Sequence, residues 1–473
     1  MIKNKITDTV SVSSFAYQTF QAYVKSPEQK PNHWGVTFIR RENYYPYGKN
    51  MVKGDLSNSI NLTAQFLKSK HEQLRLNATY RDLQIANTNV TTQKPDKSLV
   101  ARAEYLVNEW KGLLTGNAFY EVGSGQEQKK TYSYLEVPAG TGQYAWIDLN
   151  NDGIQQLNEF VIAQFPDQAK FIKVYTPTND YIKANYNTFN YSFTINPKAL
   201  INLQKSIGLQ NLIARMTLQS SLQLNQKELA SGFVQLNPLK KASLNDTSLI
   251  TRTSIFTNTF SFNKSSSKWG FDVNNSQNTG KTLLTYGYES RLLKEWTLRG
   301  RVNLSRSIML SAILKQGVNQ LFSSNTNIDS SNYNLKQYSI EPDISYTRKS
   351  NFRIMVGYKI NNKKNADEYG GQKYSSTSIN SELKYNILQS TSMLAKFTYT
   401  NISFNDKNGS VNTSSPVSYI ILDGLLPGRN YLWNLDITKK LGNNLELGIQ
   451  YEGRKPGEGH TIHTGRASLR AIL

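Results

Sequence analysis

The segment from Asp148 to Glu159 carries the pattern of a calcium-binding loop. Its sequence, DLNNDGIQQLNE, matches D-x-[DN]-x-[DN]-G-x5-E. Calcium prefers hard oxygen ligands at alternate positions and a final bidentate carboxylate, and Gly153 permits the sharp turn between them. The predicted ligands are the side chains of Asp148, Asn150, Asp152 and Glu159, the carbonyl of Ile154, and Gln156 directly or through water.

The flanks of this loop differ from those of an EF-hand. Residues 144–147 and 160–163 are typical of strands rather than helices, so we expect a calcium loop between extended segments. The alternative is a turn rich in Asn, Asp and Gly that binds no metal. The surrounding stretch, 138–180, is too apolar for a plain loop and lacks regular alternation, which predicts a folded or plug-like insertion.

Other motifs do not support an enzyme. Gly280-Lys281-Thr282 resembles the end of a phosphate-binding loop, but Asn275 stands where that motif needs its first glycine. His460 and His463 are three residues apart, which places them on opposite faces of a strand. We therefore predict that the chain is not an enzyme.

Most of the chain alternates apolar and polar residues. One example is the run in which Trp296, Leu298, Gly300, Val302 and Leu304 alternate with polar residues, and similar runs begin at Leu74, Phe352 and Leu445. Each run covers about nine to eleven residues, the length of a tilted strand that crosses a bilayer. We count about 22 such strands, joined by short turns and longer polar loops as in outer-membrane barrels.

The connections are predicted from composition. Lys294-Glu295 and Gly442-Asn443 are interpreted as tight turns. The long polar loops are predicted at 225–246, 317–333, 361–375 and 403–415. The last strand, 461–473, places Leu473 in phase with its apolar residues and is interpreted as the strand that closes the barrel.

Composition agrees with a barrel. The 473 residues contain no apolar run of about 18, which excludes a transmembrane helix. The 28 tyrosines suit aromatic girdles at the two membrane interfaces, and the absence of cysteine excludes disulfides and a thiolate metal site. The net charge of +21 is spread singly along the chain, so we do not expect nucleic-acid binding.

Basic residues opposite the apolar positions are expected to face the lumen, because a charge facing lipid is costly. They would favour an anionic substrate. The alternative is that they pair with Asp and Glu on neighbouring strands and only fill the lumen. The predicted inward residues are Arg75, Arg81, Arg102, Arg299, Arg301, Arg353, Lys359, Lys396, Arg466 and Arg470.

The chain resembles a group of large, uncharacterised outer-membrane proteins of the Bacteroidota. The resemblance rests on residues 142–160, on the YTPTNDY run at 175–181, and on the ending from His463 to Leu473. Such proteins resemble C-terminal barrels that follow a longer N-terminal region. Because residues 1–8 do not begin a signal peptide, we expect a longer precursor that carries one upstream. The final Leu473 departs from the aromatic residue with which barrels usually end.

The sequence therefore predicts an all-β protein, a large antiparallel transmembrane β-barrel. Its strands would occupy 1–137 and 181–473, with the insertion at 138–180. The predicted role is transport or export across the outer membrane, with lipid and an anionic substrate as partners and lipoprotein or periplasmic proteins as further candidates. The alternatives are a surface scaffold or adhesin with a plugged lumen, a barrel enzyme, and a soluble β-rich basic protein.

Overall fold

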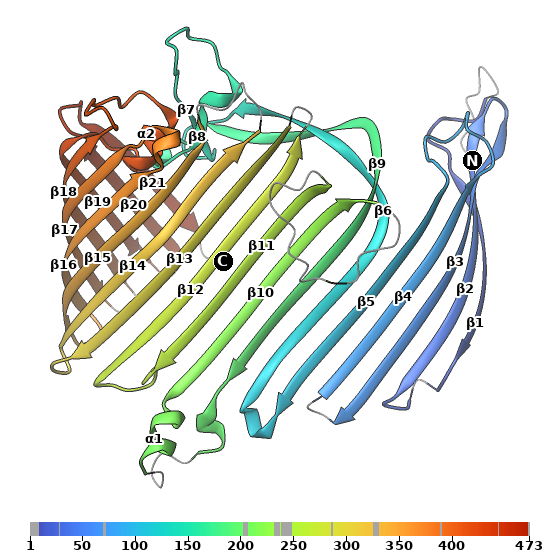
Figure 1. Ribbon diagram of the computed structural model, residues 1–473, viewed down its shortest axis with the longest axis horizontal. Helices are drawn as coiled ribbons and strands as arrows, with labels where there is room; N and C mark the ends of the chain where they lie inside the picture. The colour runs from blue at the N-terminus through green and yellow to red at the C-terminus, as the bar shows by residue number, and fades with distance from the viewer. Residues whose placement is uncertain are drawn as a thin grey trace. The chain divides into compact units, whose positions relative to one another are not determined.

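The computed structural model describes an all-β protein built on a large antiparallel sheet (Figure 1). It describes residues 9–27, 29–69, 72–201, 207–230, 237, 248–284, 287–324, 331–387, 390–442 and 444–471. The sheet contains 21 strands within these residues. The all-β, antiparallel prediction is confirmed, whereas closure of the sheet and the number of about 22 strands stay predictions.

The chain divides into two compact units. Unit 1 comprises residues 1–129, 178–214 and 219–256. It contains a meander in which each strand pairs antiparallel with the next, from β1 to β6. Its elements are β1 (Ala16–Lys25), β2 (His33–Tyr47), β3 (Asn50–Ser69), β4 (Glu72–Ile85), β5 (Asp96–Glu109), α1 (Leu209–Ala214) and most of β6 (Leu114–Glu136), β9 (Phe171–Ile195), β10 (Met216–Leu229) and β11 (Leu249–Phe262).

Unit 2 comprises residues 130–177, 215–218 and 257–473. It contains a second meander, from β12 to β21, and the short hairpin of β7 and β8. Its elements are β7 (Tyr144–Trp146), β8 (Phe160–Ile162), β12 (Trp269–Leu284), β13 (Gly287–Asn303), β14 (Ile308–Ser323), β15 (Tyr333–Arg348), β16 (Phe352–Asn365), β17 (Lys373–Ile387), β18 (Thr391–Asn405), α2 (Pro416–Ile421), β19 (Gly428–Lys440), β20 (Leu445–Lys455) and β21 (Ile462–Ala471).

The register brings apolar positions of successive strands together. Leu298 lies opposite Leu314, which lies opposite Ile340, and Ile340 lies opposite Ile360. Because side chains alternate between the faces of a sheet, a slip of one residue would move every apolar side chain to the other face. We call these positions, and those in phase with them on every strand, the apolar phase. The intervening positions form the polar phase.

The turn predicted at Lys294-Glu295 is wrong. Both residues lie inside β13, opposite Gln277 and Ser276 of β12. Neither residue forces the backbone out of the extended conformation, so a charged pair does not end the strand. The chain turns instead at 304–307, where the Ser305 hydroxyl accepts hydrogen bonds from the backbone N–H groups of residues 307 and 308.

Several predicted loops are shorter than expected because polar residues continue the strands. β14 extends to Ser323, β16 to Asn365 and β18 to Asn405, so the first residues of the loops predicted at 317, 361 and 403 are strand. Likewise, β10 extends to Leu229, into the loop predicted at 225–246. Most of that loop, Asn443 and Leu473 lie outside the described residues.

Candidate functional site

The apolar phase of unit 2 is open to the surroundings. Leu298, Leu314, Ile340 and Ile360 are 39, 40, 50 and 37% exposed. A second row runs through Val302, Leu310, Ile344 and Val356, which are 47, 38, 47 and 44% exposed. No second layer of protein covers these two rows in the described part of unit 2. A contiguous apolar surface of this kind marks contact with a membrane or another protein.

The ten predicted basic residues lie in the polar phase, and several are paired. Four form ion pairs with glutamates on neighbouring strands, at distances from 2.6 to 3.8 Å: Arg102 with Glu121, Lys359 with Glu341, Lys396 with Glu382, and Arg470 with Glu446. Two more lie opposite a carboxylate in register: Arg75 opposite Glu104 and Arg299 opposite Asp272. Arg301 donates to turn carbonyls of Lys264 and Ser266, 2.8 and 3.1 Å away. Neighbouring strands therefore supply partners for many of these cations. The remaining members of the predicted set, which also lie in the polar phase, are Arg81, Arg353 and Arg466.

The chain between β6 and β9, residues 137–170, is folded, and we call it the insertion. Its two short strands, β7 and β8, form a hairpin. Predicted residues 171–180 belong to β9 instead. The predicted calcium loop connects the two strands, and Gly153 adopts a φ of 72°, as its place in the pattern requires.

The loop is organised around Glu159, whose side chain is buried and fully shielded from solvent. One carboxylate oxygen accepts from the backbone N–H of Leu149 at 3.0 Å. The other accepts from the indole Nε1 of Trp146 at 2.7 Å and the backbone N–H of Gln156 at 3.1 Å. Through these three hydrogen bonds the Glu159 carboxylate joins the two ends of the hairpin loop.

The other predicted side-chain ligands form a second hydrogen-bonded group, which Gln156 joins to Glu159. Asp148 and Asn150 accept from the backbone of residues 152 and 153, and Gln156 donates to Asp152 at 2.9 Å. Ile154 has a 64% exposed side chain. Among the described residues no three or more His, Cys, Asp or Glu side chains are grouped to hold a metal ion. Calcium binding by this loop stays a prediction.

We expect Glu159→Gln to destabilise the insertion by about 2 kcal/mol. The amide nitrogen cannot accept a hydrogen bond, so the buried donors that now bond that carboxylate oxygen lose their acceptor. Hydrogen exchange at the Leu149 and Gln156 amides would measure this as a loss of protection. Glu458→Gln, in a solvent-accessible turn, serves as the control. Unchanged protection in Glu159→Gln would contradict this role.

The insertion is fastened to β20 through Arg454. Its guanidinium donates to both oxygens of Asp167, at 2.6 and 2.8 Å. The ring of Phe165 lies over the same guanidinium, 4.1 Å from its centroid. The Arg454 side chain is only 8% exposed, so this bidentate pair is largely removed from water. We call these three residues the latch.

Hydrogen bonding from Arg454 lowers the pKa of the Asp167 carboxyl below its usual value, against the opposing effect of partial burial. A lowered pKa in the folded state means that the stabilisation is complete above about pH 3.9 and is lost as the pH falls through the folded-state pKa. We expect the carboxyl carbon resonance of Asp167 to titrate below pH 3.9, and in Arg454→Met to titrate at a higher pH. Equal midpoints in the two proteins would contradict the assignment.

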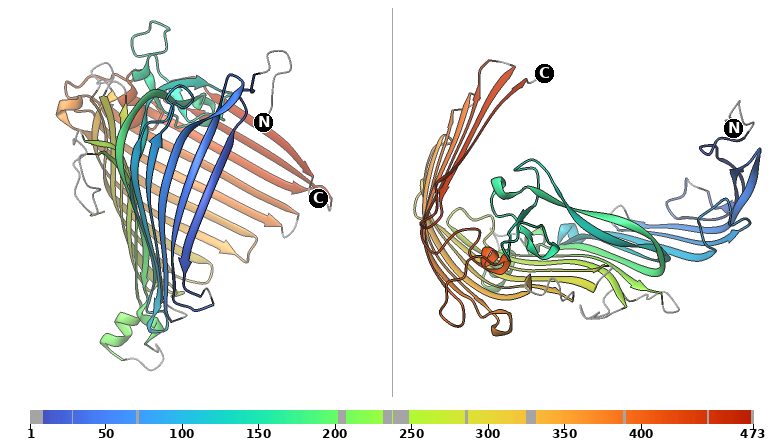
Figure 2. Two further views of the ribbon diagram at one scale, coloured as in Figure 1. Left: turned by 90° about the vertical axis from the view of Figure 1, so that its right-hand side faces the viewer. Right: turned by 90° about the horizontal axis from the view of Figure 1, so that it is seen from above.

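A second segment, residues 406–427 with α2, packs beside the insertion (Figure 2). We call it the α2 loop. Ile421 and Leu422 are buried against Tyr374, Ile402 and Phe404, all of which belong to the polar phase of β17 and β18. At this end of the strands, the positions of the polar phase therefore carry apolar side chains, and the α2 loop covers those side chains.

Lysine and tyrosine side chains fix the α2 loop. The ammonium of Lys363 donates to the carbonyl of Ile421 at 3.0 Å and to Asp423 at 2.6 Å. The Tyr419 hydroxyl donates to Gln168 and accepts from the backbone N–H of Gln164 at 2.9 Å. Tyr419 thus joins the α2 loop to the insertion.

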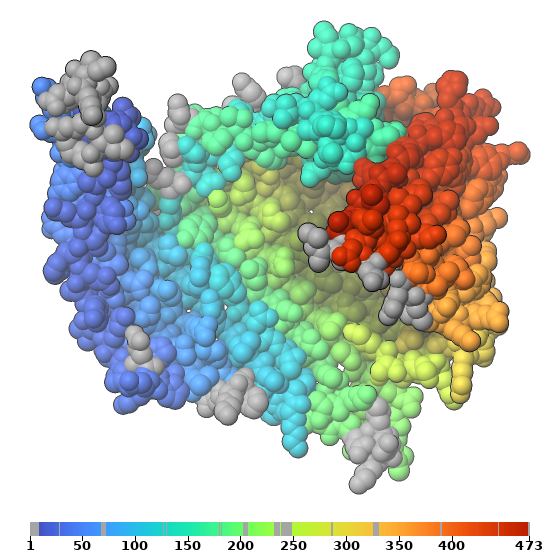
Figure 3. Space-filling model, turned by 180° about the vertical axis from the view of Figure 1, so that it is seen from behind, coloured from blue at the N-terminus to red at the C-terminus, as the bar shows by residue number. Residues whose placement is uncertain are grey.

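The start of β9, which follows the insertion, is held to β13. Lys173 lies 3.4 Å from Glu289, which also pairs with Arg291 at 2.9 Å. The Lys173 ammonium lies 4.0 Å from the ring centroid of Tyr132. Glu289 lies in the polar phase, as do Arg454, which binds the insertion, and Lys363, which binds the α2 loop. The insertion and the α2 loop therefore both contact the face opposite the exposed apolar rows. Figure 3 shows the insertion beside the last strands of unit 2.

Sequence reasoning missed the latch and the α2 loop. Asp167 is more than 250 residues away along the chain from both Arg454 and Tyr419. No local motif marks any of the three residues. A usable signal was the apolar run Val417 to Leu422 inside a stretch otherwise rich in Asn, Ser and Gly. Its length and its apolar character indicate a packed segment rather than a solvated loop.

No family model matches the chain, and no curated protein matches it. In the described part of the chain, no helix is long and apolar enough to cross a membrane.

Solved structures with some similarity are outer-membrane proteins. They include the ferripyoverdine receptor of Pseudomonas aeruginosa, at 10% identity and a TM-score of 0.37 over 96% of this chain and 63% of the receptor. The copper transporter OprC has 7% identity and a TM-score of 0.38, over 98% of this chain and 73% of OprC. Salmonella typhi OmpF has 10% identity and a TM-score of 0.29, over 89% of this chain and 96% of OmpF. The chain thus spans about 63% of the length of the first receptor.

Proposed function

We propose that this chain forms the wall of a transmembrane β-barrel in an outer membrane and serves transport or export. The observation that carries the proposal is the pair of exposed apolar rows on β13 to β16, whose side chains are 37 to 50% exposed. An apolar face that no protein covers is stable when the acyl chains of a membrane cover it. The polar phase then faces a water-filled lumen.

The insertion and the α2 loop define the covered end of this lumen. Both contact the polar phase at the ends of β14 to β19 that are joined by residues 324–332, 366–372 and 406–427, which are longer connections than 304–307, 349–351 and 388–390 at the other ends. In outer-membrane barrels the longer connections are extracellular. We place the two segments at the extracellular mouth. Their role is to narrow the path, with the latch holding the insertion over β20.

Conductance in planar bilayers tests the transport proposal. We expect wild-type protein to conduct, and Arg454→Met to conduct more because the insertion is released. The reversal potential in a salt gradient would indicate anion preference, as the lumen-facing cations predict. Conductance that is absent from both proteins would contradict a transport path.

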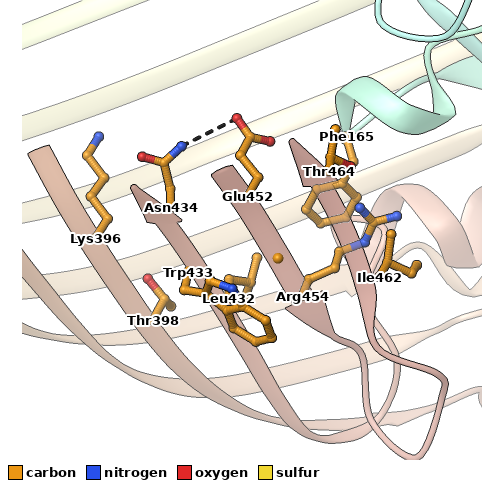
Figure 4. A pocket seen from close by; sticks show the side chains of 11 residues that line it. Phe165, Lys396, Thr398, Leu432, Trp433, Asn434, Glu452, Arg454, Ile462 and Thr464 are labelled. Carbon is orange, nitrogen blue, oxygen red and sulfur yellow. Dashed lines mark hydrogen bonds between the residues drawn. The ribbon is translucent and has the colours of Figure 1, made fainter. Parts of the chain in front are cut away.

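The second candidate function is a surface scaffold or adhesin with a plugged lumen. The contacts of the insertion favour it: Arg454 holds the insertion from β20 (Figure 4), and Tyr419 holds it from the α2 loop. A barrel of this kind inserts into membranes but does not conduct. Membrane insertion without conductance in wild type and Arg454→Met would select it.

Calcium remains part of the proposal as a stabiliser of the loop at 148–159. Its extracellular position would expose it to enough calcium for a weak site. Isothermal titration of wild type and Asp152→Ala tests it. Heat from wild type alone supports the site, and no heat from either protein removes it.

A further inference from the structure

The chain between β9 and β10 carries an exposed apolar surface, and we call it the α1 connection. The structure describes its residues 196–201 and 207–214, which include α1, and Figure 1 shows α1 beyond the end of β9. Leu200 and Ile207 are 53 and 87% exposed, and the last residue of β9, Ile195, is 40% exposed. Single apolar side chains on a protein surface are ordinary, but a concentration of them marks an interface.

The helix α1 turns its apolar side away from the protein. Leu209, Leu212 and Ile213 are three and four residues apart, so they share one face of the helix, and they are 71, 49 and 37% exposed. On the opposite face, Ala214 is 3% exposed and Asn211 is half-buried. A surface helix of a water-soluble protein packs its apolar stripe onto the core. The reversed orientation of α1 therefore indicates an apolar environment outside the chain.

A turn with an exposed tryptophan lies beside the α1 connection. Trp110 is 59% exposed and begins η1 (Trp110–Gly112), which joins β5 to β6. The backbone N–H of Asn196 donates to the carbonyl of Leu113 at 2.8 Å, which fixes the α1 connection to this turn. Tryptophan is enriched where a membrane meets water, because its ring is apolar and its indole N–H forms hydrogen bonds.

The charges of the α1 connection suit an anionic surface. No Asp or Glu occurs between Asp180 and Glu228, whereas this stretch contains five basic residues. Among them, Lys198 is exposed within the α1 connection. On the tryptophan turn, Glu109 and Lys111 offset each other in charge. A short helix with apolar residues on one face and with basic residues beside it is typical of segments that lie in the surface of an anionic membrane.

We propose that the α1 connection and Trp110 lie in the headgroup region of an anionic membrane leaflet. The apolar face of α1 enters the outer part of the acyl chains, and Lys198 lies among the lipid phosphates. The inference rests on the proposed function, since a chain that spans a membrane brings this turn to a leaflet. Because β9 begins at the insertion and ends at the α1 connection, the leaflet is the periplasmic one.

Spin labels on the full chain in vesicles test the proposal. The chain has no cysteine, so Leu209→Cys, Leu212→Cys and Gln210→Cys each give one labelled site, and Leu298→Cys reports on the barrel wall. Oxygen concentrates in acyl chains, whereas a water-soluble nickel complex stays outside them. We expect the ratio of oxygen to nickel accessibility at 209 and 212 to exceed that at 210, on the polar side of α1, about fivefold.

The lipid charge provides a second measurement. Adding phosphatidylglycerol to phosphatidylcholine vesicles should raise the ratio at 212 about twofold, because an anionic leaflet attracts the basic residues. Lys198→Gln should reduce this increase. Lys315→Gln, in the polar phase of β14, makes the same change of charge away from the α1 connection and should leave the increase as it is.

Three results would overturn the proposal. Equal ratios at 209, 210 and 212 would mean that water covers the apolar face of α1. Shielding of 209 and 212 from both oxygen and the nickel complex would mean that protein covers it, such as a second copy of the chain. No response to phosphatidylglycerol would remove the anionic leaflet. Lipid contact at 298 alone would overturn only this inference, whereas nickel accessibility at 298 would also contradict the proposed barrel wall.

Discussion

Replacing Leu298 with arginine is expected to lower the free energy of unfolding from a lipid bilayer by about 2 to 4 kcal/mol, the cost of a lipid-facing cation near mid-bilayer. Leu298 lies within the exposed apolar row, opposite Leu314 on β14. An arginine there would have to hold its charge in hydrocarbon. Denaturant titration of protein folded into vesicles measures the loss.

The adjacent residue provides the matched control. Thr297→Arg makes the same substitution one position away, in the polar phase, where Glu295 already accepts a hydrogen bond from the native hydroxyl at 2.9 Å. We expect a change within about 0.5 kcal/mol, since surface substitutions are usually that small. Equal losses in the two variants would contradict the assignment of the two phases.

Arg454→Met is expected to release the insertion. Removing one partner of a buried ion pair costs about 3 to 5 kcal/mol, and the 28% exposure of Asp167 reduces this to about 2 kcal/mol because water can solvate the carboxylate that remains. The Phe165 stack is lost in the same step. Protection of amides in 137–170 should fall about 30-fold, as 1.4 kcal/mol corresponds to a factor of ten.

Arg353→Met tests whether any polar-phase arginine would have the same effect. Arg353 lies on β16, in register with Lys384 of β17. We expect protection of the insertion to be nearly unchanged in this variant. If Arg454→Met left protection unchanged as well, the latch would not hold the insertion.

The fold was largely predictable because a strand has a period of two. The run from Trp296 to Leu304 was enough to assign the faces of β13, since alternation is local and survives without knowledge of partners. The ends of the strands were less predictable. β16 continues through Asn361 to Asn365, where the apolar phase no longer marks the strand, so composition alone suggested a loop.

The candidate site was predictable only in part. The loop from Asp148 to Glu159 was located because its pattern is contiguous, and its strand-like flanks were confirmed. The hydrogen bonds of Glu159 with the indole of Trp146 and with two backbone N–H groups were not foreseen, because the sequence pattern marks only the carboxylate and not its donors. The latch depends on a contact between Asp167 and Arg454, which only the three-dimensional arrangement brings together.

In the proposed barrel the apolar phase contacts lipid, while the polar phase contacts water. The chain contains no cysteine, so single cysteines at 296–304 can each carry a fluorophore in protein folded into vesicles. We predict that a quencher in the acyl chains acts at 296, 298, 300, 302 and 304, and that a water-soluble quencher acts at the positions between them. Quenching without this alternation, or by the aqueous quencher at all nine positions, would contradict the account.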